Sequence, residues 1–172
     1  MRAAGDLAGI RSVGRISPGR EKWPLRLVLL FTAGGGLVAA YLVKLHAAIA
    51  GNPRRGLCTF TDTLSCDKVL ASPYATIGGI PVALVGLLGF AFLFVLAAWR
   101  LFGAARSPRW LPGVLALTAG LGSGFEVVMT CVEVFAIDAV CPYCLTAFAF
   151  ILATFGASVV AWRNARAALV RD

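Results

Sequence analysis

The chain has 172 residues, of which 59% are hydrophobic and only 14% are charged, and its formal net charge is +8. This composition excludes an ordinary soluble domain and indicates a membrane protein. The basic residues are not clustered on a face or interleaved with aromatic residues, so we expect no nucleic-acid partner.

Four apolar runs are long enough to cross a bilayer core, which needs about 20 apolar residues. They cover residues 27–43, 77–99, 110–137 and 139–162. We therefore predict an all-α membrane protein, a four-transmembrane-helix bundle in a lipid bilayer, whose membrane domain covers residues 23–163. Residues 1–22 are rich in Arg, Gly, Ser and Pro and are predicted to be a disordered tail, and residues 164–172 a second tail.

Most basic residues precede the first run, link the second to the third, or follow the fourth. By the positive-inside rule, this distribution predicts that both termini are cytoplasmic. Four of the five cysteines then lie at the outer face, where disulfides persist.

The connection between the first two runs holds two of these cysteines. Cys58 stands in a polar segment that we expect to be flexible. Ser65 is a good N-cap and Asp67 suits a first turn, so residues 66–71 are predicted to form a short helix on the outer face. Cys66 at its start would be favoured as a thiolate. The pair is either redox-active or a structural staple of the loop.

The next two runs contribute glycines and two acidic residues. Gly78-Gly79-Ile80-Pro81 is expected to open the second transmembrane helix, with the proline in its first turn. In the third run, Glu126 and Glu133 are seven residues apart and share a helix face. Glu126 is either part of a proton path or a packed polar residue, whereas Glu133 is expected at the interface. Cys131 is interpreted as a small hydrophobic residue of the core.

The fourth run begins with Cys141-Pro142-Tyr143-Cys144. If Pro142 is the first helical residue, Cys141 is the N-cap and Cys144 lies one turn on, within disulfide reach and in a position that favours a thiolate. The alternative is half of a zinc site, which needs further ligands. The only histidine is His46 and the other cysteine pair is eight residues apart, so we expect two redox pairs and no metal.

Together these features resemble the vitamin K epoxide reductase family. The resemblance rests on the order and spacing of four stretches: the pair eight apart, the segment 66–72 (CDKVLAS), the Gly-Ile-Pro at 79–81 and the final Cys-Pro-Tyr-Cys. It implies a four-helix membrane bundle around a quinone, with electrons entering at the loop pair and leaving through the Cys-x-x-Cys pair. It also implies that Cys141 and Cys144 are the active-site pair and that Cys58 and Cys66 are the shuttle pair.

The resemblance further assigns Ser72 to the family's serine, and with Cys144, Glu126 and Phe148 we expect it to contact a quinone, either menaquinone or ubiquinone. Phe148 stands where the vertebrate enzymes have a tyrosine, so no phenol is available there. No thioredoxin-like domain follows the fourth run, which implies a separate, exported thioredoxin-like partner.

We accordingly expect a thiol-disulfide oxidoreductase of the bacterial inner membrane that generates protein disulfides. Cys66 is expected to attack the Cys141–Cys144 disulfide, and Cys144 to pass electrons to the quinone. Two alternatives stay open at this stage: a vitamin K quinone or epoxide reductase that uses the same site, and a cysteine-based metal-handling membrane protein.

Overall fold

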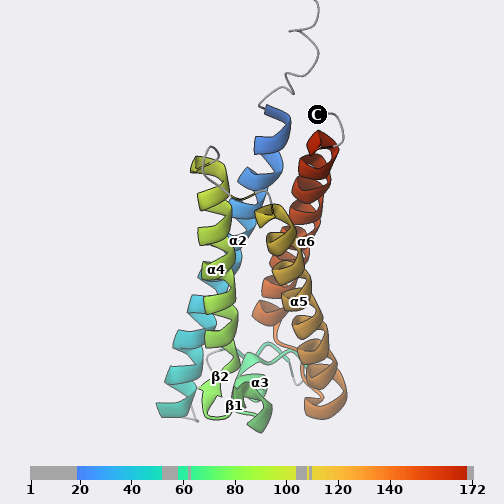
Figure 1. The fold of residues 1–172 in the computed structure, drawn as a ribbon. Coiled ribbons are helices and arrows are strands. Elements are labelled where there is room, and N and C mark those ends of the chain that lie inside the picture. The colour runs from blue at the N-terminus through green and yellow to red at the C-terminus, as the bar shows by residue number, and fades with distance from the viewer. Residues whose placement is uncertain (1–18, 52–57, 62, 104–107, 109, 170–172) are drawn as a thin grey trace, which may run out of the picture.

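The computed structural model describes residues 19–51, 58–61, 63–103, 108 and 110–169. Within these ranges four helices are long and apolar enough to cross a membrane: α2 (Gly19–Gly51), α4 (Val82–Phe102), α5 (Leu111–Val132) and α6 (Pro142–Leu169). Figure 1 shows them side by side in one bundle, with the start of α2 and the end of α6 at the same end. The predicted four-helix architecture is confirmed.

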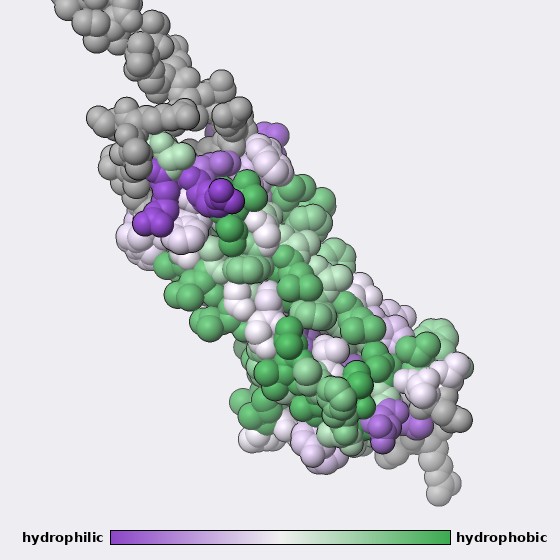
Figure 2. Space-filling view, turned by 90° about the vertical axis from the view of Figure 1, so that its right-hand side faces the viewer, coloured by the Kyte–Doolittle hydropathy of each residue, from purple (hydrophilic) through white to green (hydrophobic). Residues whose placement is uncertain are grey.

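The first and last long helices, α2 and α6, extend beyond their apolar runs. α2 begins at Gly19, before the expected membrane domain, and α6 continues through residues 164–169. Of residues 1–22, which were expected to be disordered, residues 19–22 belong to α2, and residues 1–18 lie outside the described residues. Hydrophobic residues cover the middle of the bundle face in Figure 2, and hydrophilic residues gather towards both of its ends. This banding fits a structure that spans a bilayer.

Among the described residues, two hydrophobic clusters fill the bundle. The larger one lies among the four long helices and includes Val28, Leu93, Leu115 and Ile151. The second packs α2 residues against the cysteine-bearing segments, and its buried members are Leu42, Leu45, Ile49, Cys58, Cys66, Val69, Leu70, Ala139 and Cys141. The cysteines are therefore part of the packed interior at one end of the bundle.

The connection after α2 carries the short helix α3 (Cys66–Leu70), the 3-10 turn η1 (Pro73–Ala75) and a two-stranded hairpin of β1 (Thr76–Ile77) and β2 (Ile80–Pro81). The hairpin replaces the expected helix start. Gly78 and Gly79 have φ of +59° and +84°, and two such residues form the tight turn that joins antiparallel strands. The helix α4 consequently begins only at Val82.

A π-helical segment, η2 (Glu133–Ile137), continues α5 and ends at Asp138, whose φ of 53° is left-handed. π-helical turns are rare in proteins, and those that occur are often found at functional sites. This segment turns the chain from α5 back towards the start of α6, at the end of the bundle where α3 and the hairpin lie (Figure 1).

Candidate active site

The loop pair is held tightly. The sulfur atoms of Cys58 and Cys66 lie 2.6 Å apart. The N–H of Cys66 donates to the carbonyl of Cys58 at 2.9 Å, and the N–H of Cys58 donates to Oδ2 of Asp67 at 3.0 Å. Ser65 caps α3 as predicted, since its hydroxyl accepts from the N–H of Lys68. Cys58 is 5% exposed, so it is packed and hydrogen-bonded here, in contrast to the expected flexible segment.

The second pair stands at the start of α6, where the sequence predicts it. The helix begins at Pro142, and the N–H of Cys144 donates to Sγ of Cys141 at 3.3 Å. Cys141 thus occupies the N-cap position with its sulfur as the capping acceptor. Its own N–H donates to Oε2 of Glu133 at 2.9 Å. The carboxyl group of Glu133, the first residue of η2, therefore fixes the backbone at the start of this pair.

A short parallel bridge joins the two pairs. The N–H of Val140 donates to the carbonyl of Thr63 at 2.8 Å, and the N–H of Ser65 donates to the carbonyl of Val140 at 3.2 Å. These bonds hold the residue before Cys66 against the residue before Cys141. The side chain of Cys66 accordingly interacts with that of Cys141. The four sulfurs form a series in the order Cys58, Cys66, Cys141, Cys144.

The environment of these thiols differs from the expectation of thiolates at helix N-termini. Burial raises the pKa of Cys58 from 9.0 to about 11. The pKa of Cys66 is raised chiefly by its interaction with Cys141, and that of Cys141 chiefly by its interaction with Cys144. Cys66 and Cys141 are both 0% exposed, and desolvation disfavours the charged form. In the reduced protein these side chains are therefore thiols at neutral pH.

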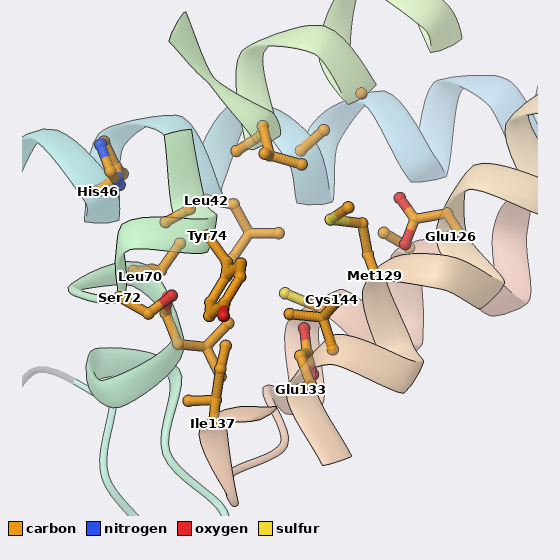
Figure 3. A pocket seen from close by; sticks show the side chains of 18 of the residues that line it. Leu42, His46, Leu70, Ser72, Tyr74, Glu126, Met129, Glu133, Ile137 and Cys144 are labelled. Atoms are coloured by element: carbon orange, nitrogen blue, oxygen red, sulfur yellow. The ribbon is translucent and has the colours of Figure 1, made fainter. Parts of the chain in front are cut away.

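A largely apolar cavity of about 70 Å³ lies beside the series, between α2, α4, α5, α6 and the connection after α2. Of the described cysteines, only Cys144 lines it. Figure 3 shows its sulfur at the cavity wall, with the carboxyl groups of Glu126 and Glu133 on the same side and Ser72 and Tyr74 opposite. Polar groups from three segments thus converge on a mainly hydrophobic space, as in small-molecule sites.

The expected quinone contacts divide into two groups. Cys144, Ser72 and Glu126 line the cavity, although the Ser72 hydroxyl donates to the carbonyl of Val69 at 2.7 Å. Phe148, one helical turn beyond Cys144, instead packs against the larger hydrophobic cluster. Cys131 is exposed on α5 rather than in the core.

Three lining residues were missed or misplaced by sequence reasoning: Glu133, His46 and Tyr74. Glu133 is 5% exposed, not interfacial. The spacing of seven residues between Glu126 and Glu133 indicated that the two share a helix face. The π-helical segment that turns Glu133 inward cannot be recognised from the pattern of apolar residues. The Nδ1 atom of His46 is buried and lacks a hydrogen-bond partner among the described residues.

These residues suit a quinone. The lining is mainly hydrophobic, and the unpartnered ring nitrogen of His46 offers a hydrogen bond to a carbonyl group. The cavity is about half the size of the ~150 Å³ cavity that holds benzene in an engineered protein, so a ring would enter only after side chains move. Among the described residues, no group of three or more His, Cys, Asp or Glu side chains is placed to hold a metal ion.

One comparison with known proteins bears on this site. The model of the vitamin K epoxide reductase family matches residues 26–159, which include all four long helices in large part and both cysteine pairs.

Proposed function

This chain belongs to the vitamin K epoxide reductase family, and on that premise we propose that it is a quinone-dependent thiol-disulfide oxidoreductase that generates protein disulfides. Membership supports a membrane oxidoreductase that works with a quinone and cysteines. The finer proposal is that a separate, exported thioredoxin-like protein supplies the electrons, and that menaquinone or ubiquinone of a bacterial inner membrane accepts them at the outer face.

The observation that carries this proposal is the series of sulfurs that ends at a cavity. Cys58 lies at one end of the series, and Cys144 at the other end is the only described cysteine that lines the cavity. A disulfide that only stabilises the loop would need a single cysteine pair. Two contacting pairs, with the last sulfur facing an apolar space, form a route for electrons between a protein thiol and a lipid-soluble acceptor.

The relay consists of successive thiol-disulfide exchanges. A dithiol of the partner attacks the Cys58–Cys66 disulfide, so that the partner becomes a disulfide and the loop pair a dithiol. Cys66 then attacks Cys141, Cys144 leaves as the free thiol, and Cys58 resolves the mixed disulfide between Cys66 and Cys141. Each exchange moves two electrons and two protons towards the cavity.

A bound quinone would accept two electrons and two protons. His46, Ser72 and Glu126 line the cavity and would hold the quinone, and Cys144, which also lines the cavity, would deliver the electrons. When Cys141 and Cys144 return to the disulfide, the cycle is complete and one disulfide has been made in the partner.

The test is complementation of a bacterium that lacks its own disulfide-forming membrane enzyme. We expect the full chain to restore disulfides in exported proteins, and serine substitution of Cys58, Cys66, Cys141 or Cys144 to abolish the restoration. Cys131→Ser is the matched control, because Cys131 is exposed and outside the site, and it should retain full activity.

Failure of the wild-type chain to restore disulfides would contradict the proposal. If membranes containing it then reduced vitamin K epoxide with a dithiol, the alternative use of the same site would be supported instead. Stoichiometric metal binding that depends on all four cysteines, without redox activity, would favour the metal-handling alternative.

A further inference from the structure

Glu133 is a buried carboxyl group in contact with the active-site pair. It is 5% exposed, its Oε2 accepts the N–H of Cys141 at 2.9 Å, and its side chain also interacts with that of Cys144. Figure 3 shows the carboxyl group next to the Cys144 sulfur at the cavity wall. One side chain therefore touches both cysteines of the pair that must exchange protons with the cavity.

The backbone around Glu133 is built to hold this position. Glu133 begins the π-helical segment, and its carbonyl accepts the N–H groups of Asp138 and Ala139, the latter at 3.2 Å. The left-handed Asp138 reverses the chain, so that Cys141 comes back onto the side chain of the residue eight positions earlier. A carboxyl group is costly to bury without a partner, and a hydrogen bond to a single backbone N–H would be satisfied equally by an uncharged amide.

We propose that Glu133 carries protons between Cys144 and the quinone bound in the cavity. This inference rests on the proposed function and names a residue for its last step. The carboxylate takes the proton of the Cys144 thiol, and the resulting thiolate delivers the electrons. Protonated Glu133 then gives that proton to a quinone oxygen. Cys141 loses the second proton as its sulfur bonds to that of Cys144. Two thiols thus lose two electrons and two protons, and the quinone takes up both.

Several other titratable groups face this region. Glu126 lies on the same face of α5, His46 comes from α2, and Tyr74 comes from η1, and all three line the cavity. Cys66 adjoins Cys141 from α3. Of the carboxyl groups, Glu133 has a hydrogen bond to the pair itself, so it is the direct proton carrier, whereas Glu126 is placed to exchange protons with it from deeper in the bundle.

The experiment compares Glu133→Gln, Glu133→Asp and Asp138→Asn in the full chain in detergent micelles. Gln keeps an oxygen for the Cys141 N–H but cannot carry a proton, and Asp keeps the carboxyl group. Asp138→Asn is the matched control, because it removes a carboxylate from the same segment at an exposed, left-handed position that Asn tolerates. One readout is the reduction of a short-chain ubiquinone or menaquinone. The other, without quinone, is the pH profile of Cys144 alkylation by iodoacetamide, followed by peptide mass spectrometry.

We expect Glu133→Gln to lower quinone reduction at pH 7 roughly 100-fold, the lower end of the range for general acid-base catalysis. Its Cys144 alkylation should shift to lower pH, because the negative charge that opposes thiolate formation is gone. Because exposure of Cys144 to water would also favour its thiolate, the melting temperature of Glu133→Gln in detergent is measured alongside and should match that of the wild type. Glu133→Asp should retain at least a tenth of the wild-type rate with an unshifted alkylation profile, and Asp138→Asn should match the wild type in both readouts.

Quinone reduction within threefold of wild type in Glu133→Gln would overturn the inference. So would an unshifted alkylation profile, which would show a positioning role only. If the wild-type protein reduces no quinone but the profile shifts in Glu133→Gln, the proposed function fails while proton exchange between Glu133 and Cys144 stands.

Discussion

The carboxylate of Asp67 determines where the loop sulfur lies. Its Oδ2 accepts the N–H of Cys58 at 3.0 Å and the hydroxyl of Thr59 at 2.7 Å. Asp67 stands in the first turn of α3, where a negative charge is favourable. The same side chain therefore supports the helix that begins at Cys66 and fixes the residue that must meet Cys66. Sequence reasoning found only the first of these roles.

Asp67→Ala should destabilise the protein by about 1–3 kcal/mol, the usual cost of leaving a buried hydrogen-bonding group without its partner. It should also slow re-formation of the Cys58–Cys66 disulfide, because Cys58 is no longer held beside its partner. Asp67→Asn keeps an oxygen for the Cys58 N–H and should lie much closer to wild type. The measurements are thermal unfolding in detergent and the oxidation rate of the reduced loop pair. Equal behaviour of the Ala variant and the wild type would contradict this role.

At the scale of helices and strands, the sequence predicts those features that depend on neighbouring residues in the chain. The four long helices are predicted by the length of the apolar runs. The start of α3 is predicted by the capping residue Ser65, and the start of α6 by Pro142, which directly follows Cys141. The hairpin at 76–81 was missed because Gly-Ile-Pro also opens helices, and the choice depends on positive φ at both Gly78 and Gly79.

The site itself depends on contacts between segments distant in the sequence. The β-bridge between Leu64 and Val140 joins residues that are 76 positions apart in the sequence. No local sequence pattern predicts this contact. The π-helical segment at 133–137 lies within a continuous apolar run, so a helical period alone leaves the inward turn of Glu133 undetected. Sequence could therefore name the cysteines, Ser72 and Glu126. The inward position of Glu133 and the cavity positions of His46 and Tyr74 required the packed structure.

Two glycines of α2 lie against Phe90 of α4, a residue that lines the cavity. An ideal Cβ on Gly35 would lie 2.3 Å from Cε1 of Phe90, whereas one on Gly36 would lie 3.8 Å from Cβ of Phe90, an ordinary contact. Phe90 is 5% exposed and lines the cavity, so its ring has little room to retreat. Close packing of α2 against α4 thus depends on the absence of a Cβ at Gly35 and only weakly on its absence at Gly36.

Gly35→Ala should destabilise the bundle by about 1–3 kcal/mol, the usual cost of overpacking. This loss exceeds the gain of up to ~1 kcal/mol that Ala brings over Gly in a helix. Gly36→Ala, which brings the same gain without the clash, should be neutral or stabilising. Melting temperatures of the two variants in detergent give the comparison. If Gly35→Ala melts at or above the wild-type temperature, the tight α2–α4 contact is not limiting.

At the scale of the whole molecule, the two cysteine pairs lie at one end of the bundle, and the start of α2 and the end of α6 lie at the other. α3, the hairpin and the start of α6 are gathered at one end, and the start of α2 and end of α6 at the other (Figure 1). The positive-inside rule predicts that this basic terminal end is cytoplasmic. The cysteine end would then face the oxidising compartment, where a newly made disulfide persists. Orientation thus decides whether the relay can serve exported proteins.

Site-directed labelling tests this orientation with one reporter cysteine at each end, in a chain whose native cysteines are replaced by serine. Phe60 is 69% exposed at the cysteine end, and Arg166 is exposed near the end of α6. In intact spheroplasts, a membrane-impermeant maleimide should label Phe60→Cys directly and Arg166→Cys only after the membrane is permeabilised. The reverse pattern would place the sulfur series in the reducing cytoplasm, and the proposed supply of disulfides to exported proteins would then be physically excluded.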